Sequence, residues 1–127
     1  EADPLPAEGV RTVVLCAGKV YYDLLEARRE AMRTDVAIMR IEQLYPFPEE
    51  RLRRELARYP QARRFVWCQE EPKNQGAWYP SQHHMRACLP AGAELEYAGR
   101  PIAAAPAVGN YQLHVKQLQT FVAQALG

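Results

Sequence analysis

Apolar residues follow two alternating patterns along this chain. Runs of almost entirely apolar residues, several of them β-branched, occupy positions 12–16, 36–41 and 65–68. Such runs are typical of strands that are buried on both faces within a parallel sheet. After each run, glycine or proline breaks the pattern, and apolar residues then return at helical spacing. The chain is therefore predicted to alternate strands with helices.

Two helices are predicted in the first half of the chain. The first follows Gly18, and its apolar residues at helical spacing are Val20, Tyr21, Leu24, Leu25 and Met32. The second follows Pro48 and turns Leu52 and Leu56 inward. Glu49 and Glu50 stand in its first turn, where the helix dipole favours acidic residues.

Two more helices are predicted in the second half. The first of these lies near residues 81–89, after a polar segment that contains Pro72 and Gly76. A shorter strand at 95–97 follows, and a last helix begins at about Asn110, a residue suited to the N-cap position. The buried stripe of this helix comprises Leu118, Phe121, Val122 and Ala125.

The order of these elements predicts the fold class. Strands that are apolar throughout and separated by helices indicate a mainly parallel sheet with helices on both faces, which is an α/β, three-layer α/β/α sandwich. The 127 residues, 48% of them hydrophobic, suffice for one core. Residues 1–9 begin with an acidic, proline-rich stretch and are predicted to be a linker or tail, and residues 10–127 form the domain.

Charge and hydropathy exclude two classes of partner. The formal net charge is +1, and most of the positive charge is arginine. Arginines, among them Arg28 and Arg29, stand among glutamates in 26–30 and 49–55. We interpret these segments as solvated helix faces and expect no nucleic-acid partner, because no aromatic residues are interleaved for base stacking. No apolar run approaches the roughly 20 residues that span a bilayer, so we expect no membrane partner.

The cysteines indicate the cellular compartment. Cys16, Cys68 and Cys88 are odd in number and far apart, and two of them stand inside apolar runs. This usage is typical of buried free thiols in a reducing compartment. We therefore expect the bacterial cytoplasm, or the mitochondrial matrix if the source is eukaryotic.

Ligands of α/β sheets collect outside the carboxyl ends of strands, so residues after each run are candidate site residues. After the first run, Lys19 and nearby amides can hold an anion, and the amides around Gly109 at the last helix can do the same. The Lys19 turn lacks a full dinucleotide or P-loop signature, and no cationic residue follows Gly109 until Lys116. We therefore favour an ordinary turn and an ordinary helix entry. A possible anion site at Lys19 and Gly109 stays open.

The most distinctive polar segment, 69–78, follows the third run. Adjacent Glu70 and Glu71 point to opposite faces of an extended chain, which disfavours a carboxylate dyad that shares a proton. We expect one glutamate to hydrogen-bond to amides of the following loop. The turn residues of this loop are Asn74 and Gly76. Trp78 is expected to anchor a contact surface. The predicted structural or interface loop comprises Glu70, Glu71, Asn74, Gln75, Gly76 and Trp78.

Other catalytic patterns are weak. His83, His84 and Cys88 fall short of four zinc ligands and include no C-x-x-C pair, so we predict no metal site. Ser81 lies near the two histidines but has no nucleophile elbow around it. A nicotinamide-dependent enzyme would need the missing G-x-G-x-x-G turn. No catalytic residue is predicted.

Three segments together carry a family resemblance. Residues 14–24 (VLCAGKVYYDL), 40–48 (RIEQLYPFP) and 67–78 (WCQEEPKNQGAW) resemble the C-terminal domain of the decarboxylating component of 2-oxoglutarate dehydrogenase. The resemblance runs from about residue 10 to residue 126. It implies a fold like the C-terminal domain of transketolase.

The resemblance also implies a parent enzyme and its partners. That enzyme decarboxylates 2-oxoglutarate with thiamine diphosphate and Mg²⁺ in the citric acid cycle, and it succinylates the lipoyl group of the dihydrolipoyl succinyltransferase complex. The family grips the cofactor through a Gly-Asp-Gly motif, which is absent from this sequence. We therefore expect no cofactor on this domain and an inactive isolated chain. The implied role is packing on the catalytic domains, homodimer assembly and regulation, and the alternative is a free-standing nucleotide- or anion-binding α/β module.

Overall fold

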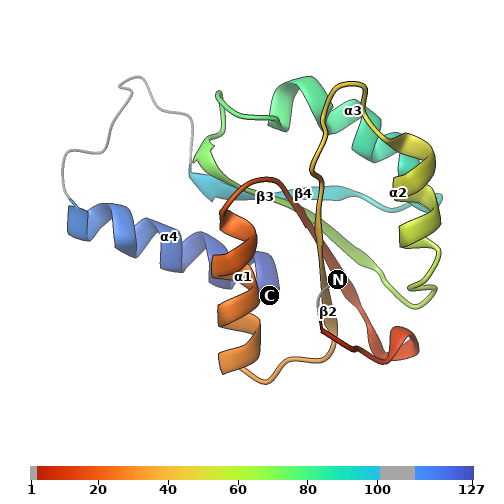
Figure 1. The fold of residues 1–127 in the computed structure, drawn as a ribbon, viewed down its shortest axis with the longest axis horizontal. Coiled ribbons are helices and arrows are strands. Elements are labelled where there is room, and N and C mark those ends of the chain that lie inside the picture. Colours follow the sequence, from red (N-terminus) through yellow and green to blue (C-terminus); the bar gives the residue numbers. More distant parts are fainter. Residues whose placement is uncertain (1–2, 101–110) are drawn as a thin grey trace.

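The structure is a computed structural model that describes residues 3–100 and 111–127. In these residues four strands form one sheet in the order β2-β1-β3-β4, and every neighbouring pair is parallel. The strands are β1 (Thr12–Cys16), β2 (Val36–Arg40), β3 (Arg64–Pro72) and β4 (Leu95–Arg100). The predicted parallel sheet is confirmed (Figure 1).

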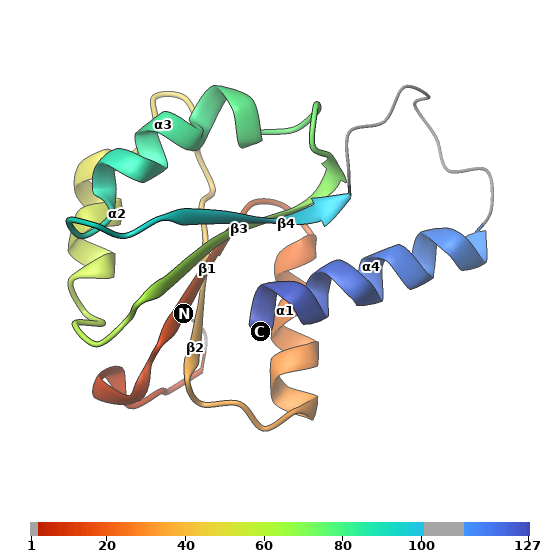
Figure 2. The ribbon, with the colours of Figure 1, turned by 180° about the vertical axis from the view of Figure 1, so that it is seen from behind.

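Helices cover both faces of the sheet. The described helices are η1 (Ala7–Gly9), α1 (Val20–Glu30), α2 (Glu49–Leu56), α3 (Trp78–Cys88) and α4 (Tyr111–Leu126). Figure 2 shows α1 and α4 on one face and α2 and α3 on the other, so the three-layer sandwich is also confirmed. None of the described helices is long and apolar enough to cross a bilayer.

The strands divide the core into two layers because successive side chains point to opposite faces. In β1, Val13 and Leu15 pack with the α2 and α3 side, and Val14 and Cys16 pack with the α1 and α4 side. All five residues of β1 are buried. The apolar pattern alone therefore located the strands that carry the core.

Several element boundaries differ from those predicted, among them the end of β4, which extends to Arg100. β3 continues from the apolar run to Pro72 because polar Gln69 is buried within it, with 2% of its surface exposed. Helix α3 begins at Trp78 and includes Pro80, whose missing N–H costs nothing in the first turn of a helix. Met32 was predicted among the apolar residues of the first helix, but it lies beyond the end of α1, has a φ of 51° and is 85% exposed.

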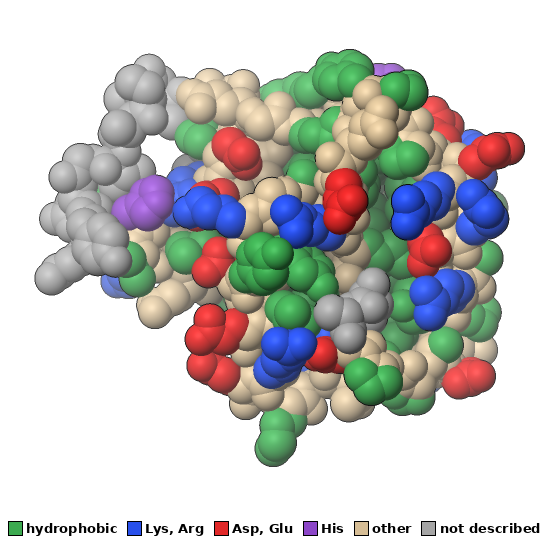
Figure 3. All heavy atoms as spheres, viewed as in Figure 1, with side chains coloured by type: hydrophobic (Ala, Val, Ile, Leu, Met, Phe, Trp, Pro, Cys, Tyr) green, Lys and Arg blue, Asp and Glu red, His purple; other side chains and the backbone are tan. Residues whose placement is uncertain are grey.

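Arg28 corrects the prediction of a solvated arginine face. Only 1% of its surface is exposed, and its guanidinium donates to the carbonyl of Val36 at 3.0 Å and to Oδ2 of Asp3 at 2.8 Å. Arg29, which is exposed, donates to the same carboxylate at 2.6 Å. The two arginines thus attach Asp3 to α1. On α2 the interpretation as a solvated face holds, because Arg51, Arg53 and Arg54 are exposed. Figure 3 shows basic and acidic side chains interspersed on one face of the molecule.

The attachment of Asp3 predicts a pH dependence. Hydrogen bonds from Arg29 and Arg28 hold the pKa of Asp3 well below its usual range. A carboxyl with a lowered folded-state pKa stabilises the fold above its unfolded pKa, about 3.9, and loses that contribution as the pH falls toward the folded value. In urea unfolding, wild type should therefore exceed Asp3→Asn in stability at pH 6, and the difference should shrink below about pH 4. A difference that grew on acidification would contradict the attachment.

The three cysteines are free and buried, as predicted. Burial raises the pKa of the Cys16 thiol to about 12 and raises the pKa of Cys68 even further. These two thiols face each other in register on β1 and β3. Because the thiolate is the reactive form, both act as small apolar core residues.

Candidate functional site at the carboxyl end of the sheet

The strand order reverses between β1 and β3, because the chain passes from β1 out to β2 and then back across to β3. In open α/β sheets this reversal leaves a crevice outside the carboxyl ends of the strands, where ligands and partners bind. A pocket of about 310 Å³ occupies this place, and we call it the switch-point pocket. Its lining residues are Ala17, Gly18, Leu44, Tyr45, Trp67, Glu71, Gly76, Ala77, Pro80 and Ser81.

Gln69 organises the segment that borders this pocket. Its Oε1 accepts hydrogen bonds from Trp67 Nε1 at 2.8 Å and from the backbone N–H of Trp78 at 3.1 Å. The second bond satisfies one of the free amides at the start of α3. A single buried amide oxygen therefore connects β3 to α3.

The other end of the Gln69 amide holds the β3 loop, which we define as residues 73–77. Nε2 lies within hydrogen-bond distance of three carbonyls, those of Glu71 (3.1 Å), Pro72 (2.9 Å) and Gln75 (2.8 Å). The residue that orders the loop is thus this glutamine, which corrects the expectation that a glutamate does so. An amide supplies both donors and an acceptor, whereas a carboxylate would only accept.

Glu70 and Glu71 lie at an irregularity in the pairing of β3 with β4, whose register passes from Gln69↔Gly99 to Pro72↔Arg100. Oε1 of Glu70 is 3.1 Å from Nζ of Lys19, and Glu71 lines the switch-point pocket. The two carboxylates therefore meet different surroundings. The pKa of the Asp23 carboxyl is raised above its usual value. Burial of Asp23 is the larger cause, and the negative charge of Glu70 is the second.

Arg100 joins α4 to this irregularity. Its side chain is 5% exposed and donates to the carbonyl of Glu70, to Oε1 of Gln117 at 3.2 Å and to the carbonyl of His114 at 3.2 Å. The backbone carbonyl of Arg100 accepts from the Tyr97 hydroxyl at 2.8 Å. Burial raises the pKa of Tyr97 to about 12, so this hydroxyl keeps its proton and remains a donor.

The remaining residues of the predicted loop divide between surface and core. Asn74 and Gln75 are exposed in the β3 loop, whereas Trp78 is 5% exposed and packs edge-on against Tyr97 with ring centroids 5.2 Å apart. The aromatic residues that reach the surface nearby are Tyr79 and Tyr45, which sequence reasoning did not single out. Their signal is the proline beside each, which is typical of an exposed turn or helix start.

Gly76 provides a prediction about loop geometry. Its φ of +68° is a left-handed conformation, and an added Cβ would lie 3.2 Å from both Gln69 Oε1 and Glu71 Cβ. Gly76→Ala is expected to lower the free energy of unfolding by about 2 kcal/mol, through backbone strain and this contact. Gly92→Ala is the matched control, because Gly92 has a φ of +81° and open space around it. Equal losses for the two variants in urea unfolding would show that the contact with Gln69 is unimportant.

The anion site and the histidine cluster show different outcomes. Lys19 forms the ion pair with Glu70, which neutralises part of the charge of the lysine. Gly109 lies outside the described residues, so the anion site stays a prediction.

The histidine cluster makes contacts within the domain. His84 Nδ1 is 2.7 Å from Glu49 Oε2, and the Cys88 thiol points to the carbonyls of Glu49 and His84. In residues 3–100 and 111–127, no group of three or more His, Cys, Asp or Glu side chains is placed to hold a metal ion.

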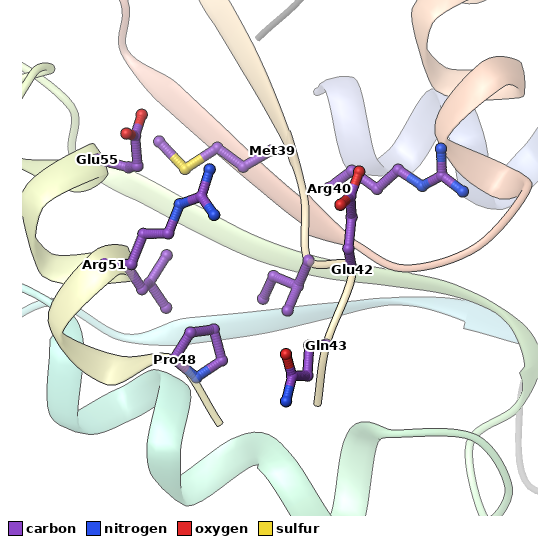
Figure 4. Close-up of a pocket in the computed structure, with 9 residues that line it drawn as sticks. Met39, Arg40, Glu42, Gln43, Pro48, Arg51 and Glu55 are labelled. Carbon is purple, nitrogen blue, oxygen red and sulfur yellow. The ribbon is translucent and has the colours of Figure 1, made fainter. Parts of the chain in front are cut away.

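A second hollow, of about 360 Å³, lies between edge strand β2 and helix α2. Figure 4 shows Arg51 reaching from α2 toward Met39, whereas Arg40 points away toward α1. Arg40 lies over the rings of Tyr21 and Tyr22, 5.8 and 5.5 Å from their centroids. This hollow contains none of the residues predicted for function.

Comparison with known proteins identifies the family. The chain matches the family described as 2-oxoglutarate dehydrogenase C-terminal over residues 1–126. It is 54% identical over 126 residues to the 2-oxoglutarate dehydrogenase E1 component of Haemophilus influenzae and 52% identical over 128 residues to that of Azotobacter vinelandii. These matches cover 99% and 98% of this chain, but only 14% of each relative.

A solved structure described as split gene transketolase, inactive beta4 tetramer, has the same fold. The TM-score is 0.60 at 20% sequence identity, and the match covers 94% of this chain and 39% of that chain. This likeness concerns the fold alone, and it agrees with the fold that the sequence resemblance implied. Since the family match extends across nearly the whole sequence, the chain belongs to the 2-oxoglutarate dehydrogenase C-terminal family.

Proposed function

We propose that this chain is the C-terminal part of a longer enzyme that decarboxylates 2-oxoglutarate. The enzyme then passes the succinyl group to the lipoyl group of a dihydrolipoyl succinyltransferase complex, within the citric acid cycle. The proposal rests on relatives that carry the name 2-oxoglutarate dehydrogenase E1 component and are at least 50% identical. The chain spans about 14% of their length, so the chemistry is assigned to the longer polypeptide.

Thiamine diphosphate, with Mg²⁺, would supply the carbanion stabilisation that decarboxylation needs. The described residues of this chain do not fit that cofactor, because they offer no metal-ligand group and the sequence has no Gly-Asp-Gly motif. No catalytic step is therefore assigned to this chain. That the domain binds no cofactor is part of the proposal.

The domain's own role, we propose, is assembly: it packs on the catalytic domains of the same enzyme and contributes to a homodimer. The observation that carries this is the Gln69 network, which holds the β3 loop in one conformation beside the switch-point pocket. A loop whose backbone is fixed in advance loses little entropy when a partner binds it. Regulation through this interface is part of the same role.

We place the enzyme in the bacterial cytoplasm. The relatives named above are bacterial. The three cysteines of the described residues are free thiols, which supports a reducing compartment.

An activity assay tests this function. The full polypeptide, with thiamine diphosphate and Mg²⁺, should decarboxylate 2-oxoglutarate faster than pyruvate, and the chain of residues 1–127 alone should have no activity. The measurement is carbon dioxide release under identical conditions for both proteins. Turnover by the isolated chain, or a preference of the full polypeptide for pyruvate, would overturn the proposal.

A further inference from the structure

A large aromatic side chain is exposed at the switch-point pocket. Tyr45 lines the pocket, yet 76% of its surface is exposed. Exposed aromatic residues around a pocket mark sites where proteins dock, because such residues bury a large area at a small entropic cost. This surface is therefore suited to another segment of protein.

The pocket itself suits an apolar side chain. Trp67, which is 1% exposed, and Ser81, which is 3% exposed, belong to its buried lining, and Ala17, Leu44 and Pro80 contribute apolar surface. A volume of about 310 Å³ can receive a large side chain. The exposed ring of Tyr45 extends the surface beyond the pocket, which favours a polypeptide segment over a small molecule.

Glu71 adds a charge to this surface. It is exposed at the pocket, and within residues 3–100 and 111–127 it has no ion pair, whereas neighbouring Glu70 is paired with Lys19. The basic residue of the β3 loop, Lys73, lies over the rings of Trp78 and Tyr97, at 5.9 and 5.2 Å from their centroids. A carboxylate at the rim of an apolar pocket favours a lysine or arginine on the partner.

We infer that the switch-point pocket receives a segment from the remainder of the same polypeptide, which inserts a large apolar side chain and places a lysine or arginine on Glu71. The inference rests on the proposed function. The length of the relatives supports this occupant, since about six sevenths of each lies outside the region that matches this chain. The occupant belongs to the catalytic domains, and a second copy of the chain is the competing outcome.

Photo-cross-linking in the full polypeptide tests this inference. A benzophenone amino acid replaces Tyr45, and the cross-linked peptides are identified by mass spectrometry. We expect one major cross-link to a peptide outside residues 1–127 that contains a lysine or arginine. The control is the same replacement at Met32, which is 85% exposed beyond the end of α1 and is not among the residues that line the pocket. Cross-links only to a second copy of this region, or none above the Met32 control, would overturn the inference.

A charge reversal tests the role of Glu71 separately. Glu71→Lys should lower the yield of the Tyr45 cross-link severalfold in folded protein, whereas Glu94→Lys, at an exposed glutamate ahead of β4, should leave it unchanged. Equal yields in the two variants would remove Glu71 from the site. Cross-linking needs no turnover, so it can succeed even where the assay for 2-oxoglutarate decarboxylation fails.

Discussion

Gln69→Leu is expected to lower the free energy of unfolding by about 3 to 5 kcal/mol, the largest effect of any substitution considered. Leucine fills similar space but leaves the N–H groups of Trp67 and Trp78 without their acceptor and three carbonyls without their donor. A buried polar group that loses its partner costs about 1 to 3 kcal/mol, and water can reach some of these groups in the loop. Urea unfolding of the variant and wild type measures the loss.

Two further variants serve as controls for Gln69→Leu. Gln119→Leu, at an exposed position of α4, should change the stability by less than about 0.5 kcal/mol. Gln69→Glu keeps the acceptors but cannot donate to the three carbonyls, so it should be as harmful as the leucine variant near neutral pH. A loss below about 1 kcal/mol for Gln69→Leu would mean that the network does not hold the loop.

Arg100→Met is expected to lower the stability by about 3 kcal/mol. Methionine retains much of the apolar stem. It loses the guanidinium, which lies over the ring of Phe121 at 5.2 Å from the centroid and donates to the carbonyls of Glu70 and His114. Hydrogen bonds from a charged donor contribute about 1.5 to 3 kcal/mol each to stability. Part of this loss is offset, because the variant no longer has the desolvation cost of a buried guanidinium.

The location of this loss is as informative as its size. Hydrogen exchange should accelerate in α4 and at the end of β3, the two elements that Arg100 joins, more than in α2. Arg58→Met is the matched control, because Arg58 is an exposed arginine paired with Glu55, and such pairs contribute less than about 1 kcal/mol. Uniform acceleration across all helices would contradict a local role for Arg100.

The sequence predicted the layers of the fold because apolar periodicity reports which residues are buried. Val14 and Leu15 illustrate this, since a run without alternation required a sheet covered on both faces. The burial of Arg28 was not predicted, because arginine is usually at the surface. Its spacing of four and three residues from Leu24 and Leu25 places it on the same helix face and could have indicated burial.

The candidate site could be predicted only in part. Segment 69–78 was located by its polarity, but the pairing of β3 with β4 decides that Gln69 points inward and that Glu70 and Glu71 separate. Local sequence does not contain such long-range register. The exposure of Tyr45 depends in the same way on where the neighbouring segments fold.

The central claim is that the carboxyl end of β3, with Glu70 and Glu71, and the β3 loop organise an interface and do not take part in the reaction. Its most direct test is the pH dependence of kcat/KM for 2-oxoglutarate decarboxylation by the full polypeptide with both Glu70 and Glu71 replaced by glutamine. The apparent pKa values of the profile should stay those of the unaltered enzyme, even if weaker docking lowers the rate. The loss of one limb of the profile, with a rate lowered about a hundredfold or more in folded protein, would contradict the claim because it is what removal of a general acid or base produces.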